Sequence, residues 1–320
     1  VPGYERFRLP SYAFLIENAE GRKVLFDLGL RKDWKNLTPE ALHEIQSDEI
    51  KIDIERDVVD ILLEGVANSW TSHHHWDHIG DMSRLPNTTS IVIGPGFEKA
   101  FLPGYPENPH SPVLQTDYEN HEVRELDFSA QTVPIGPFKG IDFFGDGSFY
   151  LVDAPGHSIG HVCGIVRTTT APDTFVFMGA DAANHNGEFR PSQYKPLPES
   201  ISPHPLLPKS VHPCPGESWA RYLESRGRSK RMPFFSIPDT SAGAAYTYDV
   251  QASNKTIEMV QDIDSGEDIL IVIAHDESIR GIVDFFPRSI NDWKAKRWGA
   301  NHAWAFLKDF QKISIDPVAA

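Results

Sequence analysis

The chain has no long hydrophobic run. None of its apolar stretches approaches the roughly 20 consecutive residues that a membrane-spanning helix needs, so no membrane segment is expected. Cysteine is also scarce, because Cys163 and Cys214 are the only two thiols and cannot form a disulfide framework. This favours a reducing compartment, and we expect a cytoplasmic protein. Residue 1 is Val rather than Met, which leaves open that a signal peptide or another natural N-terminus preceded it.

Positive charge is in short supply as well. Lys and Arg total 30 against 45 Asp and Glu, giving a formal net charge of −15. A protein that binds nucleic acid needs lysines and arginines to contact phosphates, so this balance argues against such a partner. The one basic cluster, residues 221–231, is interpreted as a solvated helix end and loop. We expect a small-molecule partner and neither nucleic acid nor membrane, while composition leaves the oligomeric state open.

Histidine, by contrast, is concentrated in one short motif. Residues 71–80 read Thr-Ser-His-His-His-Trp-Asp-His-Ile-Gly. Imidazole nitrogen and carboxylate oxygen are ligands for divalent ions such as zinc. In an extended or tightly turning loop, alternate side chains point the same way, so His73 and His75 can bind one ion while Asp77 and His78 reach a second. Two adjacent cations can share a hydroxide, which is a hydrolytic nucleophile at neutral pH.

Three short apolar runs further along the chain each lead to another ligand-type residue. The runs and residues are 149–152 with His157, 175–178 with Asp181, and 269–274 with His275. Such runs, bounded by turn residues, predict buried strands. Because α/β folds build their sites at the carboxyl ends of strands, these three residues are candidates to complete the metal site.

The complete series resembles the ligand set of the metallo-β-lactamase fold superfamily. Within it, the series resembles the dinuclear hydrolase branch, which includes acyl-homoserine lactonase-like members and fungal lactamase-lactonase-like members. All seven family positions are filled in order: His73, His75, Asp77, His78, His157, Asp181 and His275. The apolar runs 14–16 and 24–29, separated by a turn at 20–21, also resemble the strand pair that opens this fold. The resemblance implies an α/β fold, a four-layer αβ/βα sandwich.

We expect one domain over residues 1–320, because ligands from both halves of the chain must converge. Loop insertions are predicted near 101–117 and 190–240; the part at 190–215 contains eight prolines, which disfavour regular structure. The stretches 101–109 and 190–215 are expected to wall an apolar substrate pocket. Helices are predicted at 39–46, 55–64, 254–261 and 300–310, and a further strand at 90–93.

The resemblance also implies how the ligands divide. His73, His75 and His157 would hold the first ion, Asp77, His78 and His275 the second, and Asp181 would bridge the two. Zn²⁺ is the expected metal, with iron and manganese left open because the same ligands bind them. His74 is expected to point away from the metals, and His161 to contact a ligand rather than act as one. A functional role for His185 and a supporting role for Asp276 are left open.

The function implied is that of a dinuclear-metal hydrolase which opens a small cyclic ester or amide, a lactone or else a lactam or cyclic carbamate. The nucleophile would be a hydroxide held between the two ions, with Asp77 orienting it and moving its proton. Tyr194 lies 13 residues beyond Asp181, where lactonases of this superfamily carry a tyrosine that donates a hydrogen bond to the substrate. Tyr194 is therefore a candidate catalytic residue, with apolar packing as its alternative role.

Other functions stay open as alternatives. A thioesterase of the glyoxalase II type shares the motifs Thr-x-His-His-His-Trp-Asp-His and Gly-His-x-x-Gly-His-x-Cys. The continuation at residues 182–185 departs from that family, and the C-terminal part shows no obvious basic cluster for a glutathione carboxylate. An acyl-carrier thioesterase is a further alternative. A metal redox or binding protein is less favoured, because diiron members usually replace an early histidine of the motif with a carboxylate.

Overall fold

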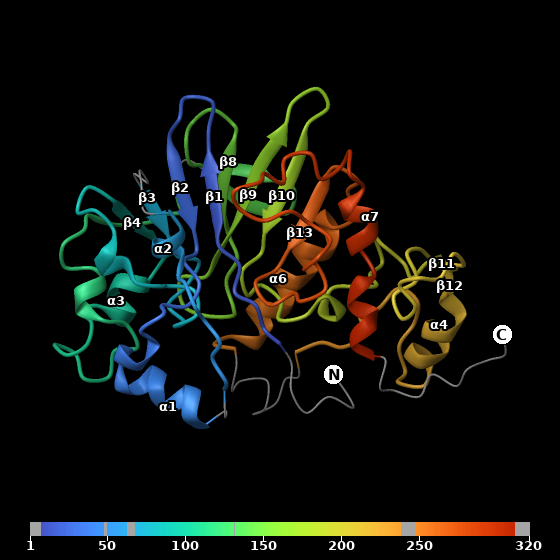
Figure 1. The fold of residues 1–320 in the computed structure, drawn as a ribbon, viewed down its shortest axis with the longest axis horizontal. Coiled ribbons are helices and arrows are strands. Elements are labelled where there is room, and N and C mark those ends of the chain that lie inside the picture. Colours follow the sequence, from blue (N-terminus) through green and yellow to red (C-terminus); the bar gives the residue numbers. More distant parts are fainter. Residues whose placement is uncertain (1–7, 48–49, 63–67, 131, 238–246, 311–320) are drawn as a thin grey trace.

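Two β-sheets form the centre of the molecule (Figure 1). The computed structural model describes residues 8–47, 50–62, 68–130, 132–237 and 247–310. The first sheet has the strand order β1-β2-β3-β4-β5, with bounds Phe14–Glu17, Lys23–Phe26, Asn68–Trp70, Ser90–Ile93 and Val123–Glu125. The second has the order β13-β10-β9-β8-β7-β6, with bounds Ile269–Val272, Thr174–Met178, Val162–Thr169, Phe149–Asp153, Phe138–Asp142 and Val133–Ile135.

The two sheets pack face to face through alternating side chains. Phe149 and Leu151 of β8 join Val24 and Phe26 of β2 in one buried cluster between the sheets. Val152, which points the opposite way from β8, belongs to a second cluster on the outer face. This period-2 alternation is what a strand buried on both faces requires, and it explains why the runs that lead to the ligands are apolar throughout.

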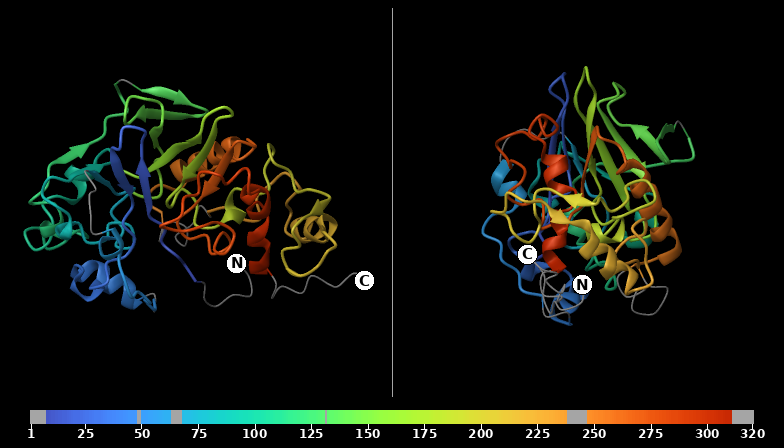
Figure 2. Two further views of the ribbon diagram at one scale, coloured as in Figure 1. Left: turned by 45° about the horizontal axis from the view of Figure 1, so that its top comes forward. Right: turned by 90° about the vertical axis from the view of Figure 1, so that its right-hand side faces the viewer.

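Helices cover the outer face of each sheet. Helix α6, Val250–Ile263, buries Ile257 and Val260 against the second sheet (Figure 2). The short helix α3, Phe97–Phe101, packs with Ile91 and Ile93 of β4 on the first sheet. The predicted four-layer αβ/βα sandwich is therefore confirmed.

Helix boundaries follow local capping. Thr38 precedes α1, Pro39–Ser47, and its Oγ1 accepts a hydrogen bond from Ala41 N at 3.2 Å, as an N-cap residue does. Helix α6 begins four residues before the predicted 254, because Asp249 caps it through a bond from Ala252 N. Helix α2, Val58–Leu62, begins three residues after the predicted 55, and the predicted 63–64 lie outside the described residues.

The C-terminal helix predicted at 300–310 is interrupted. Helix α7 spans Trp298–His302, and a separate 3₁₀ helix spans Ala305–Phe310. The stretch 190–237 also contains regular structure that the sequence did not predict: the strand pair β11, Ser200–Ile201, with β12, Cys214–Pro215, and helix α4, Gly216–Glu224. Within the described part of the chain, no helix has the length and apolar character to cross a membrane. That residues 1–320 form one domain stays a prediction.

Candidate metal centre

The ligand candidates lie on four loops that follow four strands. The motif at 73–78 follows β3, and His157 follows β8. Asp181 and His275 follow β10 and β13, which pair in parallel. Because parallel neighbours end at the same sheet edge, these last two side chains meet there. All seven predicted residues are brought together in two groups, His73, His75, His157 and Asp181, and Asp77, His78 and His275.

The first group is compact. His75 Nδ1 lies 2.8 Å from His73 Nε2 and 3.0 Å from His157 Nε2. His73 is fully buried and His157 is 7% exposed. Burial, together with the neighbouring imidazoles, holds the pKa of both His73 and His157 well below the usual value. These rings are therefore neutral at pH 7, which is the form that binds a metal.

Asp181 stands between the two groups. Its Oδ2 lies 3.3 Å from His157 Nε2, while its Oδ1 lies 3.3 Å from both His78 Nε2 and His275 Nε2. One carboxylate oxygen therefore faces each group, as the predicted bridging role requires.

The second group has donors aimed at a common point. Asp77 Oδ2 lies 3.6 Å from His275 Nε2 and 3.9 Å from His78 Nε2. His78 Nε2 and Asp181 Oδ1 are buried and lack a hydrogen-bond partner in the described structure. Buried polar atoms without partners are costly, and an ion between them would satisfy both. The donor set therefore fits two divalent ions, while the individual ligand assignments stay predictions.

Asp27 supports both groups, although it is not among the site residues predicted from the sequence. Its Oδ1 accepts a bond from Ser72 N at 2.6 Å, and its Oδ2 accepts from His78 Nδ1 at 2.8 Å and from Ser72 Oγ at 3.0 Å. Ser72 Oγ in turn lies 2.9 Å from His73 Nδ1. These bonds place the proton of each ring on Nδ1 and leave Nε2 free for a metal. An acidic residue directly after the buried strand β2 is the signal that could have identified Asp27.

Two other histidines, His161 and His74, belong to neither ligand group. His161 donates from Nδ1 to Ala154 O at 2.8 Å, and its Nε2 accepts from Asp181 N at 3.2 Å. Burial lowers the pKa of His161 to about 4, so it stays neutral and positions the backbone of Asp181. The ring of His74 stacks on Phe101 with centroids 4.0 Å apart, and His74 belongs to neither ligand group.

His185 and Asp276 lie outside the two groups. His185 Nε2 is 3.2 Å from Asp309 Oδ2, and its ring contacts Phe235. Asp276 pairs with the buried His302. Because Asp276 directly follows His275 in the chain, the Asp276–His302 pair anchors the loop that carries this ligand.

A cavity of about 860 Å³ opens onto the two groups. Its apolar lining comes from Leu9, Ile50, Trp76, Phe101 and Ile159, and its polar lining outside the metal centre includes Asn184 and Tyr248. The first predicted insertion contributes Phe101. Among the described residues, 190–215 contributes nothing to the lining, so its predicted role as a cavity wall is wrong. The reason is that Leu197, Ile201 and Cys214 pack instead with the C-terminal 3₁₀ helix.

Tyr194 is likewise not among the residues that line the cavity in the described structure. Its side chain is 47% exposed, and its backbone N donates to Ser192 Oγ at 3.2 Å. Tyr248, which the sequence did not suggest, lies on the cavity wall, where its backbone N donates to His157 O at 2.9 Å. A catalytic role for Tyr194 stays a prediction.

A four-layer sandwich with a two-part histidine–aspartate centre defines a metal-dependent hydrolase. The family model described as metallo-beta-lactamase superfamily matches residues 6–176. The gamma-lactamase FDB1 of Fusarium pseudograminearum is 36% identical over 331 residues, covering 100% of this chain and 79% of that protein. The metallo-hydrolase mfmC of Annulohypoxylon moriforme is 39% identical over 321 residues, covering 97% and 81%. The chain therefore belongs to the metallo-β-lactamase superfamily.

Solved structures agree on the fold. A crystal structure of a quorum-quenching N-acyl homoserine lactone lactonase matches with a TM-score of 0.50 at 17% identity, covering 88% of this chain and 85% of that one. At this level of identity, the likeness shows the fold alone.

Proposed function

We propose that this protein is a dinuclear hydrolase that opens a small lactam or lactone ring. The observation that carries the proposal is the position of Asp181, with one oxygen toward each ligand group. The Fusarium relative, whose match covers 100% of this chain, is named a gamma-lactamase. That name supports a cyclic amide as substrate. A lactone is the second ring chemistry to test, because both reactions begin with attack on an acyl carbon.

We propose Zn²⁺ in both positions, since the donors are imidazole nitrogens and carboxylate oxygens. When bound, two such ions supply Lewis acidity and bring the pKa of water down to about 7. His73, His75 and His157 would hold one ion, and Asp77, His78 and His275 the other, with Asp181 shared.

Asp77 is the proposed proton carrier. Its side chain is 18% exposed, whereas that of Asp181 is 5% exposed, so Asp77 is the more accessible of these two carboxylates in the cavity lining. A carboxylate in this place can accept a proton from the attacking water and deliver it to the leaving nitrogen or oxygen. Ring opening needs that delivery most for an amide, because an amide anion is the poorer leaving group.

The cavity walls support a largely apolar substrate. Trp76, Phe101 and Ile159 offer apolar surface beside the reacting centre. The volume of about 860 Å³ is well above what a lone five-membered ring fills, so a ring carrying an apolar substituent suits it better. Such walls also exclude water, which strengthens electrostatic interactions with the developing negative charge.

The test is ring opening by the zinc-loaded protein, monitored by product mass for every substrate. Proton release gives a second readout for the lactones and the thioester only, because hydrolysis of a lactam yields a carboxylate and an ammonium group and releases no net proton at neutral pH. The panel is a matched γ-lactam and γ-lactone pair with the same apolar substituent, their unsubstituted parents, and S-lactoylglutathione. We expect turnover of the substituted rings and little of the parents. Turnover of the thioester alone would reject the proposal in favour of a thioesterase.

A pair of conservative variants, Tyr194→Phe and Tyr248→Phe, addresses the proposed hydroxyl donor. If Tyr194 assists catalysis, its variant lowers kcat on the preferred ring, whereas unchanged kcat and KM would end that proposal. An effect confined to Tyr248→Phe would assign the donor to the phenol on the cavity wall.

A further inference from the structure

Three consecutive residues before β1, Pro10, Ser11 and Tyr12, hydrogen-bond to the second ligand group or its flank; we call them the tether. Pro10 O accepts from His275 Nδ1 at 2.9 Å, and Ser11 Oγ donates to Asp77 Oδ2 at 3.1 Å. Tyr12 OH donates to Asp276 O at 3.0 Å. The tether therefore joins the N-terminal segment to two ligands that lie 66 and 265 residues away along the chain.

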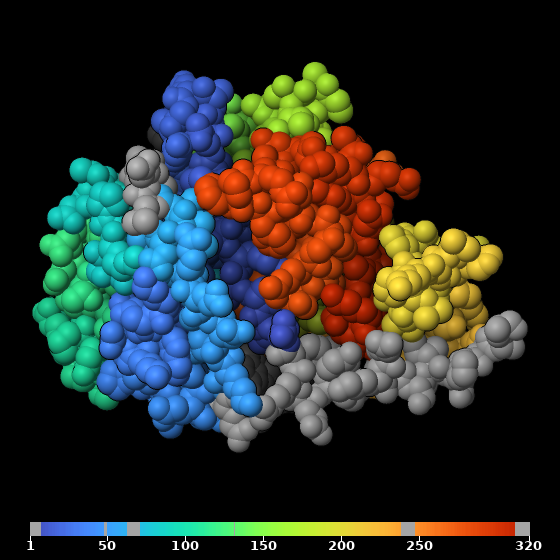
Figure 3. All heavy atoms as spheres, viewed as in Figure 1, coloured from blue at the N-terminus to red at the C-terminus, as the bar shows by residue number. Residues whose placement is uncertain are grey.

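Packing holds the tether against the ligand loop. Figure 3 shows the N-terminal segment, in dark blue, at the middle of one face between the light-blue and orange parts of the chain. Gly29 has φ +64°, and a Cβ there would lie 3.5 Å from Ser11 O, so the loop after β2 runs directly beside the tether. That loop is bonded to the ligand motif through Leu28 N to His78 O at 2.8 Å and Gly80 N to Gly29 O at 2.9 Å.

Each tether bond has a defined effect on a ligand atom. Because a carbonyl can only accept, Pro10 O requires the proton of His275 on Nδ1 and leaves Nε2 available as a ligand. The Ser11 hydroxyl fixes the rotation of the Asp77 carboxylate. Tyr12 holds the backbone at the residue after His275.

The first ligand group has different support. His73 Nδ1 is bonded by Ser72 Oγ, and Asp181 N by His161. Among the hydrogen bonds of the described residues, none joins the tether to His73, His75 or His157. The tether therefore distinguishes one half of the centre from the other.

We propose that the tether sets the metal affinity of the second group, so that residues 10–12 decide whether the centre holds one ion or two. The inference rests on the dinuclear centre of the proposed function, but not on the identity of the substrate. Outer partners that orient metal ligands typically contribute 10–100-fold to metal affinity. Losing the Ser11 hydroxyl should therefore weaken the second binding step and leave the first unchanged.

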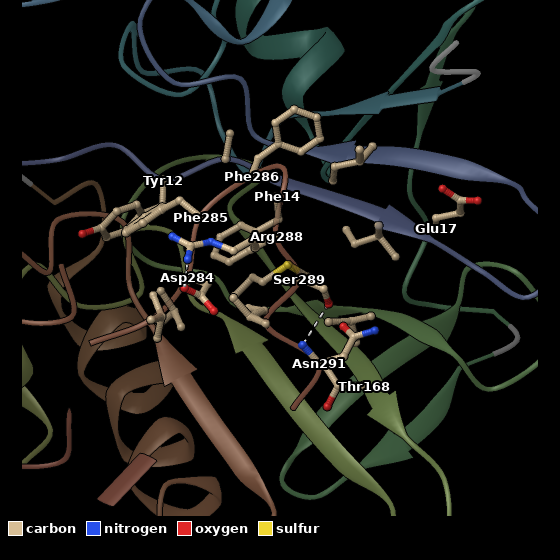
Figure 4. Close-up of a pocket in the computed structure, with 18 of the residues that line it drawn as sticks. Tyr12, Phe14, Glu17, Thr168, Asp284, Phe285, Phe286, Arg288, Ser289 and Asn291 are labelled. Carbon is tan, nitrogen blue, oxygen red and sulfur yellow. Dashed lines mark hydrogen bonds and ion pairs between the residues drawn. The ribbon is translucent and has the colours of Figure 1, made fainter. Parts of the chain in front are cut away.

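Tyr12 offers a variant that deletes one bond and keeps the packing. Its ring lies 5.9 Å from that of Phe285, at a cavity of about 420 Å³ that β1 and the 283–291 segment line (Figure 4). Tyr12→Phe keeps this ring contact and removes only the hydroxyl that bonds Asp276 O. Any change in metal binding then reports the hydrogen bond rather than a cavity in the structure.

The experiment is zinc titration of metal-free protein, by calorimetry and by competition with a chromophoric chelator. Variants are Ser11→Ala, Ser11→Thr and Tyr12→Phe, with Ser83→Ala as the matched control, because Ser83 Oγ donates to the non-ligand Asp81 at 2.6 Å. For Ser11→Ala we expect the first dissociation constant within twofold of wild type and the second raised about 10–100-fold. Tyr12→Phe should also raise the second dissociation constant. Ser11→Thr, which keeps a hydroxyl, should leave the second dissociation constant near that of wild type.

Elemental analysis after dialysis gives an independent readout. Wild type and Ser83→Ala should retain two zinc ions per chain, and Ser11→Ala about one. Equal weakening of both steps, or a Ser11→Ala titration that matches Ser83→Ala, would overturn the tether proposal while leaving a two-ion wild type intact. A wild-type protein that binds fewer than two ions would overturn the dinuclear function itself, and the tether proposal with it.

Discussion

Replacing Asp27 with Asn tests whether the partner of a ligand, rather than the ligand itself, determines metal binding. Asp27 has φ +59°, a left-handed conformation that Asn tolerates, so Asp27→Asn adds no backbone strain. The amide keeps one oxygen, which can still accept from Ser72 N. Its nitrogen then faces His78 Nδ1, where the carboxylate accepts at 2.8 Å.

The consequence is a change of tautomer. An amide NH₂ can only donate, so His78 must accept on Nδ1 and carry its proton on Nε2. That nitrogen is the one aimed at Asp181 Oδ1, 3.3 Å away, and a protonated nitrogen cannot bind a metal. If affinity falls by the roughly 10–100-fold typical of such partners, the stabilisation gained from zinc falls by about 1.4–2.8 kcal/mol at saturating metal.

The assay is urea unfolding of wild type and Asp27→Asn at one fixed excess of free zinc and again in chelator. The control is Asp127→Asn. Asp127 is exposed and also accepts from a serine backbone N–H, at 2.7 Å, but it belongs to neither ligand group. We expect Asp27→Asn to lose part of the zinc-dependent gain and Asp127→Asn to lose none. A full zinc-dependent gain in Asp27→Asn would refute the tautomer reasoning.

Further outcomes follow from the same geometry. Asp181→Asn should lower turnover by more than the roughly 100-fold that outer partners reach, with reduced zinc by elemental analysis; turnover within tenfold of wild type would contradict the bridging role. Phe101→Ala removes the ring stacked on His74 and should cost about 3–5 kcal/mol in urea unfolding, against less than about 1 kcal/mol for the exposed Phe286→Ala. Burial raises the pKa of the Asp117 carboxyl from 3.8 to about 7, so its folded form binds the proton more tightly than the unfolded chain does. Wild-type stability relative to Asp117→Asn should therefore fall as pH rises from about 4 to about 7, by at most about 4 kcal/mol, and a constant difference in unfolding free energy would exclude this shift.

The ligand series could be predicted from the sequence because its pattern is local. His73, His75, Asp77 and His78 lie within six residues, and the other three ligands each follow a short apolar strand. Strand ends in an α/β fold converge on one edge, so knowing which runs are strands is enough to bring these residues together.

The supporting contacts could not be predicted in the same way. Ser11 meets Asp77, and Pro10 meets His275, only because the chain before β1 folds back across the edge of both sheets. No local pattern encodes such a meeting. Tyr194 shows that a local spacing can also mislead. Its distance along the chain from Asp181 predicted a place in the cavity, but the segment that follows it packs with the C-terminal 3₁₀ helix, and Tyr194 is not in the described cavity lining.

The two halves of the centre differ in a way that bears on chemistry. In the first group His73 is fully buried and His157 is 7% exposed, while His75 is partly exposed and lines the cavity. In the second, the side chains of Asp77 and His275 are 18% and 11% exposed. Both groups therefore reach the cavity, but among the hydrogen bonds of the described residues only the second group is bonded to the N-terminal residues 10–12. Because a one-ångström displacement of a reacting group can cost about 100-fold in rate, the bonds made by residues 10–12 bear directly on where Asp77 can move a proton.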